Sequence, residues 1–172
     1  MPRFSNKEVV LLLKEAVAAM EINGENKFGI RAYQNALSTI DSLTMNVYDL
    51  WENGHLGEVQ GVGAALEQHL SELFSTGKVK EWENKKKDLP DGLFGLLVLR
   101  GVGAKTAYKL AKEFKIKKRE DALEIIKKAA QEGKIQKLPG FGAKSEADIL
   151  QSIEQLKKSK QEKQRMLLVH AE

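Results

Sequence analysis

Three short motifs in the sequence place one apolar residue between two glycines. They are GVG at residues 61–63, GVG at 101–103 and GFG at 140–142, and each precedes an alanine and a helical pattern. Glycine accepts a positive φ and lacks the Cβ that would hold a ligand away from the backbone. The unpaired amides of the following helix point to the same place, where the helix dipole favours an anion. Each motif therefore predicts a hairpin between two helices that can bind a phosphate group, with its middle apolar residue packed between the helices.

The side chains that follow the second and third motifs add to this chemistry. Lys105 and Thr106 follow the second motif, and Lys144 and Ser145 follow the third, so each hairpin gains one cation and one hydroxyl. Such donors hold a DNA backbone without reading its bases, so we expect binding that tolerates any sequence. The first motif is followed by two alanines and Glu67. Its expected role is structural, or a contact made by backbone amides only.

A single motif of this kind is more often an ordinary turn between helices than a ligand site. Three copies in register, two of them with a lysine and a hydroxyl, favour a DNA contact instead. The predicted DNA-binding residues are Gly61, Gly63, Gly101, Gly103, Ala104, Lys105, Thr106, Gly140, Gly142, Ala143, Lys144 and Ser145.

The hairpins need helices on both sides, and apolar residues recur at three- and four-residue spacing along nearly the whole chain. Strand-like alternation is almost absent, so we expect an all-α protein. Ser5 and Glu8 form a capping-box pattern for a first helix that ends at Asn23 and Gly24. Further helices are expected at residues 28–40, 47–51, 64–75, 78–87, 90–98, 104–114, 119–131 and 143–158, followed by a charged tail or linker at 159–172.

The motifs recur at separations of 40 and 39 residues. A repeat of this length is also typical of helical solenoids, which stack helix pairs into surfaces that bind other proteins. Nothing in a solenoid requires two glycines in every copy, so we favour tandem helix-hairpin-helix units. A helical repeat that binds protein is kept as an alternative.

Charge is polarised along the chain. Residues 1–90 carry 10 Lys and Arg against 13 Asp and Glu, whereas residues 91–172 carry 18 against 11, within a net charge of +4. A basic second half suits a polyanionic partner, because lysine and arginine release counterions when they bind phosphates. The chain has no cysteine, which excludes thiolate metal sites and disulfides. Its apolar runs fall far short of the ~20 residues of a bilayer span. We therefore expect a cytoplasmic, nucleoid-associated monomer with no membrane partner.

Five motifs in order resemble the N-terminal region of bacterial and archaeal family X DNA polymerases, the polymerase beta-like family. They are ENKFGIRAYQNA at 25–36, VQGVGAALEQHL at 59–70, STGK at 75–78, LRGVGAKTAYKL at 99–110 and LPGFGAKSEADIL at 138–150. The resemblance implies a domain similar to the polymerase beta N-terminal lyase domain at residues 1–88, which contains the first hairpin. A fingers-like domain with the second and third hairpins is implied at residues 89–158.

The palm of that family does not occur in these 172 residues, so polymerisation is not expected of them. The resemblance also implies a 5′-deoxyribose-phosphate lyase, in which a lysine amine attacks the sugar aldehyde and forms a Schiff base. The family's lysine falls here on His69, and its phosphate-binding lysines fall on Gly29, Gly57 and Ala65. Imidazole forms no stable imine, so we expect no catalytic residue at this position.

The leading hypothesis is therefore DNA binding of the repair-polymerase type through backbone phosphates, on nicked, gapped or intact duplex DNA. A lyase that uses Lys78 or Lys80 as a relocated nucleophile is the enzymatic alternative. The resemblance further implies a monovalent cation, Na⁺ or K⁺, at the hairpins. In the second hairpin it would be held by the backbone carbonyls of Leu97, Leu99 and Val102. No other cofactor is expected.

Overall fold

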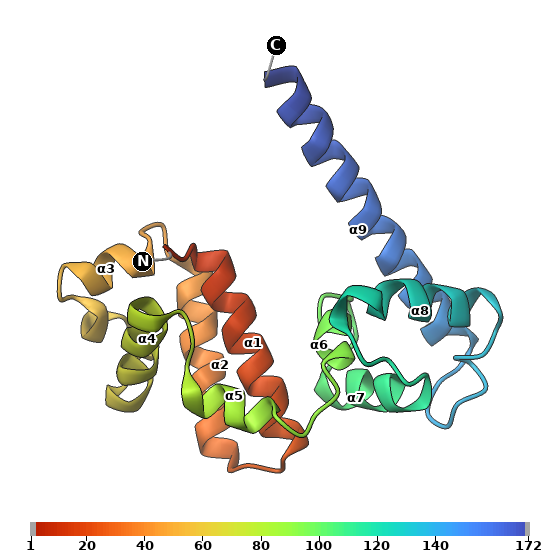
Figure 1. The fold of residues 1–172 in the computed structure, drawn as a ribbon, viewed down its shortest axis with the longest axis horizontal. Helices are drawn as coiled ribbons and strands as arrows, with labels where there is room; N and C mark the ends of the chain where they lie inside the picture. The colour runs from red at the N-terminus through yellow and green to blue at the C-terminus, as the bar shows by residue number, and fades with distance from the viewer. Residues whose placement is uncertain (1–2, 171–172) are drawn as a thin grey trace. The chain divides into compact units, whose positions relative to one another are not determined.

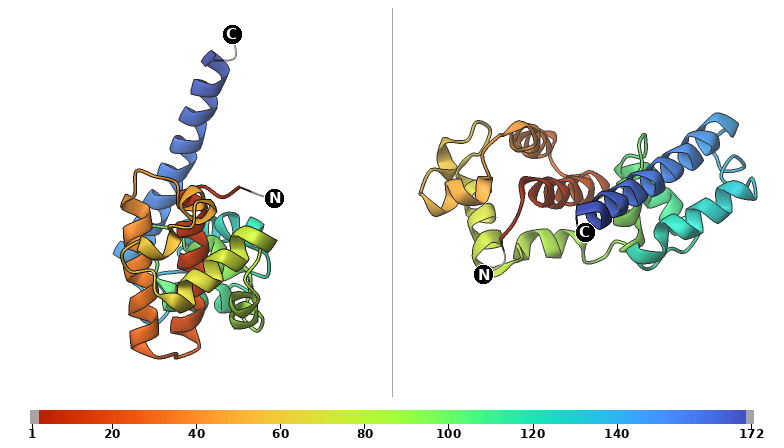
Figure 2. Two further views of the ribbon diagram at one scale, coloured as in Figure 1. Left: turned by 90° about the vertical axis from the view of Figure 1, so that its left-hand side faces the viewer. Right: turned by 90° about the horizontal axis from the view of Figure 1, so that it is seen from above.

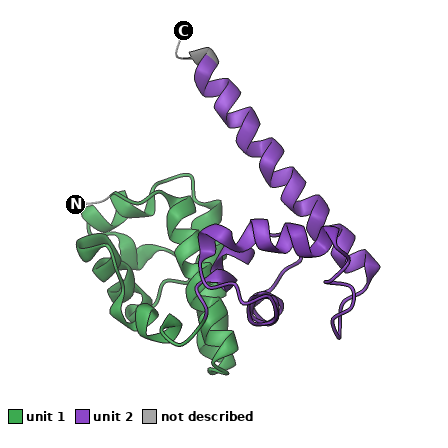
Figure 3. Ribbon diagram, turned by 45° about the vertical axis from the view of Figure 1, so that its right-hand side comes forward, with its two compact units in different colours: residues 1–89 green, residues 90–172 purple. Residues whose placement is uncertain are grey.

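The computed structural model describes residues 3–170, with side chains as far as residue 168, and is all-helical over that range (Figure 1). Nine α-helices and one short 3-10 helix form within these residues, and no strand does. The chain divides into two compact units between Leu89 and Pro90 (Figure 3). None of the described helices combines the length and the apolar character that a membrane crossing requires.

The first unit contains five α-helices and the 3-10 helix. These are α1 (Asn6–Ile22), α2 (Lys27–Ser42), α3 (Val47–Glu52), η1 (Leu56–Glu58), α4 (Ala64–Thr76) and α5 (Lys80–Lys86). The first helix begins as the capping pattern predicts, because the Ser5 hydroxyl accepts a hydrogen bond from the Glu8 amide at 3.2 Å. α1 packs along α2 and also contacts α5 (Figure 1).

Apolar residues from all five α-helices form the core of this unit. The side chains of Leu13, Ile40, Leu70 and Phe74 are fully buried, and Trp82 of α5 belongs to the same buried cluster. Burial of large apolar side chains is the main source of stability in a unit of this size. The core thereby fixes η1 and α4, the two elements on either side of the first hairpin.

The second unit contains α6 (Gly92–Leu96), α7 (Ala104–Glu113), α8 (Arg119–Gln131) and α9 (Ala143–His170). α6 contacts both α7 and α8, and α9 packs on α8. The largest fully buried side chains of the unit are Leu93, Leu96, Leu110, Ile116, Ile126 and Ile135. The second hairpin joins α6 to α7, and the third joins α8 to α9.

Two glycines of α6 allow an unusually close approach to α8 and to the segment before it. A Cβ built on Gly92 would lie 2.3 Å from both the carbonyl oxygen and Cγ2 of Ile116. A Cβ built on Gly95 would lie 2.6 Å from the carbonyl oxygen of Arg119. No side chain larger than hydrogen fits at either position without moving backbone, so the packing of this unit depends on both glycines.

The sequence predicts nearly all helices to within a few residues, but the end of the last helix at residue 158 is wrong. α9 continues to His170, so residues 159–170 are helical rather than a linker. This segment contains no glycine or proline and is rich in Lys, Gln, Glu and Leu, which are strong helix formers. The continuous helix extends beyond the other helices of its unit (Figure 2). The short helix η1 was not predicted.

Candidate functional site

The three glycine motifs form hairpins with one shared hydrogen-bond pattern. In each hairpin two successive turns are closed by an amide that donates to the carbonyl three residues earlier. The donors and acceptors, 3.0–3.2 Å apart, are Val59 to Leu56 and Val62 to Val59, Leu99 to Leu96 and Val102 to Leu99, and Leu138 to Ile135 and Phe141 to Leu138. The three hairpins are therefore repeats of one structure, as the spacing of the motifs predicts.

The first glycine of each motif has a positive φ, at +88° for Gly61, +83° for Gly101 and +85° for Gly140. The second glycine is extended and serves as the N-cap of the next helix in the first two hairpins. Glycine offers no side-chain acceptor there, so the cap leaves the first-turn amides of α4 and α7 free to bind a ligand. This arrangement is the one that the anion-binding hypothesis requires.

The first hairpin packs against its own unit. A Cβ built on Gly61 would lie 3.4 Å from the Cα of Ala36, so the tip of the hairpin lies on the backbone of α2. The carboxylate of Glu67 lies close to Gly57, with 3.0 Å between Oε2 and a Cβ built on that glycine. The nearby carboxylate disfavours an anion, and the packed tip indicates that this hairpin mainly supports the fold of its unit. Gly63 still has open space around it.

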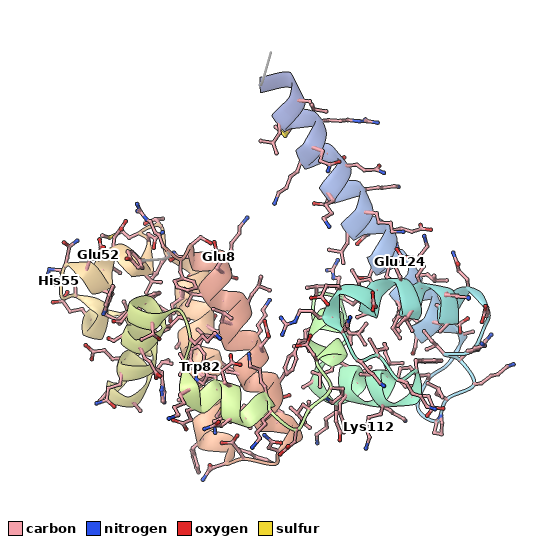
Figure 4. All side chains as sticks on the ribbon, in the orientation of Figure 1. Glu8, Glu52, His55, Trp82, Lys112 and Glu124 are labelled. Carbon is pink, nitrogen blue, oxygen red and sulfur yellow. The ribbon has the colours of Figure 1, made fainter. Side chains whose placement is uncertain are left out.

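The second and third hairpins border one cleft of about 620 Å³ within the second unit. Five of the predicted residues line it: Gly101, Lys105, Thr106, Gly140 and Ser145. The cleft lining thus contains one glycine and one hydroxyl from each of the two hairpins, together with the lysine of the second hairpin. Figure 4 shows the side chains of this unit, with Lys112 marking α7 and Glu124 marking α8.

The other predicted residues of these two hairpins lie at the starts of α7 and α9 rather than in the cleft lining. Lys144 is exposed on the first turn of α9, and Ala104 is buried at the start of α7. The remaining ones, Gly103, Gly142 and Ala143, are exposed beside them. Lys144 can therefore reach a ligand that extends past the cleft.

Sequence reasoning missed several residues that line the cleft. They are Arg100 and Lys109 on the side of the second hairpin, and Asp148, Gln151 and Gln155 on α9. Helical spacing from Ser145 could have identified the residues on α9, since residues three and four apart share a face. Three cations, Arg100, Lys105 and Lys109, stand against a single carboxylate in this lining. The cleft is thus suited to an anionic ligand.

Two buried polar side chains of α9 hold the backbone near these hairpins. The hydroxyl of Ser152 accepts a hydrogen bond from the Arg100 amide at 2.9 Å. The carboxylate of Glu146 accepts from the amides of Ile135 and Gln136 at 3.1 and 3.0 Å. Neither role was predicted, because a polar residue on the core face of a helix does not identify its backbone partner.

The middle residue of the third hairpin departs from the predicted packing. Val62 and Val102 are buried between their helices, whereas Phe141 is only half-buried. The ammonium of Lys109 lies 5.4 Å from the centre of the Phe141 ring, and its Nζ donates a hydrogen bond to the carbonyl of Pro139. A cation of α7 therefore covers the ring that the hairpin leaves exposed.

A second polar cluster surrounds His69 in the first unit. His69 Nε2 lies 3.0 Å from Glu81 Oε2, and its ring centre is 6.1 Å from that of Trp82. The indole of Trp82 donates to the hydroxyl of Tyr33 at 3.0 Å. Lys85 Nζ joins the cluster, 3.7 Å from the other oxygen of Glu81. Lys78 and Lys80 are both exposed.

Electrostatics keep the amine of Lys85 protonated. Burial alone would lower the pKa of Lys85, but its hydrogen bond to Glu25 and the charges of Glu25 and Glu81 outweigh burial, so the pKa is raised above its ordinary value. For the Tyr33 hydroxyl, in contrast, burial itself raises the pKa. A Schiff-base nucleophile needs an unprotonated amine, and this cluster works against one.

Comparisons with known proteins agree with this geometry. The family model described as "Helix-hairpin-helix domain" matches residues 4–79, and the one described as "SAM-like Helix-hairpin-helix tandem" matches residues 95–155. The first match contains the first hairpin, and the second match contains the other two.

One curated relative is the "DNA polymerase/3'-5' exonuclease PolX" of Bacillus subtilis (strain 168). It is 33% identical to this chain over 147 residues, which is 86% of this chain and 25% of the relative. This chain therefore spans about a quarter of the length of that protein.

Proposed function

We infer that this chain binds DNA through the sugar-phosphate backbone. The chain carries tandem helix-hairpin-helix units and resembles the helix-hairpin-helix region of family X DNA polymerases. The observation that carries this proposal is the cleft that the second and third hairpins both border, with its glycines, hydroxyls and excess of cations. Phosphates are the groups that such a surface binds best, and they are regularly spaced along any DNA strand.

In the second hairpin, amides at the start of α7 donate to a phosphate oxygen while Thr106 adds a hydroxyl donor. Lys105 is exposed on the same turn and neutralises the phosphate charge. The dipole of α7 adds partial positive charge at the same point. The glycines permit this contact, because no atom lies within 4 Å of a Cβ built on Gly101 or Gly103.

The third hairpin repeats this site at the start of α9, with Lys144 and Ser145 in the corresponding positions. A Cβ built on Gly142 also meets open space. Two sites of this kind on one unit hold two phosphates of the same DNA molecule. Because neither site reaches base edges, affinity does not depend on base sequence. The first hairpin supports the fold of its unit and contributes at most the amides near Gly63.

Nicked, gapped and intact duplexes are the DNA forms that we propose as ligands. The direct test measures binding of the full chain to intact, nicked, gapped and single-stranded DNA of equal length. We expect tighter binding to nicked or gapped DNA than to single strands. Equal affinity for all four forms would contradict a structural preference, and no binding to any of them would contradict the proposed function.

The dependence of affinity on salt is the first quantitative prediction. If about five phosphates are neutralised, the logarithm of affinity should fall with the logarithm of salt concentration at a slope of about −4 to −5. Two unrelated duplexes of equal length serve as mutual controls and should give the same slope and the same affinity. A strong preference for one duplex would contradict binding through the backbone.

The same titration, run once in NaCl and once in KCl, tests a proposed monovalent cation at the second hairpin. The carbonyls of Leu97, Leu99 and Val102 are neutral oxygen donors of the kind that such cations accept. The Leu99 carbonyl accepts one hydrogen bond, from the Val102 amide, which leaves its second lone pair for an ion. The donor chemistry of these carbonyls supports the proposal. When bound, it would add positive charge beside the phosphate.

The lyase alternative predicts a covalent adduct, and we expect none. Borohydride reduces a Schiff base between a lysine and a 5′-deoxyribose-phosphate end, so it traps the protein on DNA only if an amine has attacked the sugar. The chain should give no trapped product, because His69 lies at the family position and the pKa of Lys85 is raised. A trapped product that disappears in Lys78→Met or Lys80→Met would contradict this and identify a relocated nucleophile.

A further inference from the structure

Lys109 connects the two hairpins that border the cleft. We propose that it is a positioning residue, which holds the third hairpin against the second so that both bind DNA as one clamp. The proposal rests on the proposed function and adds to it a residue that lies outside both glycine motifs. It also states how the two phosphate sites depend on each other.

The side-chain hydrogen bond and the cation–π contact of Lys109 both fall on the third hairpin, although the residue belongs to the helix that follows the second. Its Nζ donates to the carbonyl of Pro139 and lies 5.4 Å from the centre of the Phe141 ring. A Cβ built on Gly140 would lie 3.6 Å from the same Nζ. One ammonium group therefore contacts Pro139 and Phe141 and lies beside the glycine between them.

A second contact links the two hairpins in the opposite direction. Ser152 of α9, the helix after the third hairpin, accepts a hydrogen bond from the amide of Arg100, next to the second hairpin. Each helix thus holds the loop that precedes the other helix. Ser152 is buried, whereas Lys109 is exposed and can be replaced without opening the core.

Fixed spacing between two phosphate sites raises affinity without any new contact to DNA. Once one hairpin has bound, a rigidly placed second hairpin meets its phosphate at a high effective concentration. If the third hairpin moves freely, that advantage is reduced even though Lys144 and Ser145 are still present. Lys109 should therefore influence binding through the third hairpin.

The test compares Lys109→Met with Lys112→Met. Both residues are exposed on α7, and both substitutions remove one positive charge. Lys112 also lies over an aromatic ring, at 5.0 Å from the centre of Tyr108, but that ring belongs to its own helix. We expect Lys109→Met to weaken DNA binding about tenfold or more, through lost effective concentration. Lys112→Met should change it by less than about threefold, the effect of one peripheral charge.

Two further measurements separate positioning from a direct phosphate contact. In the free protein, amide hydrogen exchange at Phe141, whose amide closes the hairpin turn, should become faster in Lys109→Met and not in Lys112→Met. In a double-mutant cycle, Lys144→Met should cost less affinity in the Lys109→Met background than in the native chain. A direct contact by Lys109 alone would give additive losses and unchanged exchange.

The outcomes distinguish this proposal from the proposed function. If the native chain binds no DNA, the proposed function fails and the clamp fails with it. If the native chain binds DNA but Lys109→Met behaves like Lys112→Met, the clamp is wrong and the proposed function stands. Additive losses with unchanged exchange also overturn the positioning role. A selective loss of affinity, with coupling to Lys144 and faster exchange at Phe141, supports it.

Discussion

Reversing the charge of both hairpin lysines, in the double variant Lys105→Glu and Lys144→Glu, should weaken DNA binding by on the order of a thousandfold. Each lysine that contacts a phosphate releases one counterion, and losing that contact costs about fivefold at physiological salt. Glutamate adds repulsion of similar size at each site. The variant should therefore lose nearly all measurable affinity.

The fold should survive this double substitution. Both side chains are exposed in the first turns of α7 and α9, where glutamate interacts favourably with the helix dipole. The melting temperature should consequently stay within a few degrees of the native value. Fluorescence anisotropy with a labelled gapped duplex gives the affinity, and circular dichroism gives the stability.

Lys128→Glu provides the matched control for charge. Lys128 is exposed on α8 and does not line the cleft, so its reversal changes the charge of the same unit without touching a hairpin. We expect an affinity within about threefold to fivefold of native. A loss as large as that of the double variant would mean that DNA binds by general charge attraction rather than at the hairpins.

Gly92→Ala should produce the largest loss of stability. The added Cβ would lie 2.3 Å from the carbonyl oxygen of Ile116, and that oxygen belongs to backbone that cannot rotate away. Overpacking typically costs about 1–3 kcal/mol, and contact with fixed backbone places this variant at the upper end of that range. In a unit of fewer than 100 residues the melting temperature should fall by more than about 10 °C.

Gly29→Ala is the control for this substitution. Gly29 lies within α2, and a Cβ there would meet only the end of the flexible Met20 side chain at 3.6 Å. Alanine in a helix is favoured over glycine by about 0.5–1 kcal/mol, so this variant should be at least as stable as the native chain. Equal stability of the two variants would show that α6 does not depend on close contact with residue 116.

The positions of the helices and the three hairpins could be predicted because local signals agree with one another along this chain. Caps such as Ser5, glycines at 61, 101 and 140, and apolar residues at helical spacing all act over a few residues. The continuation of α9 beyond residue 158 is encoded by local signals as well, because its last turns are rich in helix formers and contain no stop signal. A row of charges does not by itself end a helix.

The candidate site was only partly predictable for a physical reason. Lys105, Thr106 and Ser145 follow their motifs directly, so local order in the sequence places them beside the cleft. Lys109 and Ser152 act across the unit, on residues 30 and 52 positions away. Such contacts depend on how α7 and α9 pack, and no short motif encodes that packing.

The continuous helix α9 begins at the third hairpin and runs for 28 residues. At 1.5 Å per residue it is a rod of about 42 Å, and a rod of this kind transmits orientation as well as distance. Removing a single residue from its middle would shorten it by only about 1.5 Å but would turn everything beyond that point by about 100°. The number of residues in α9 thus sets the direction in which the side chains of its last turns point relative to a phosphate bound at the third hairpin.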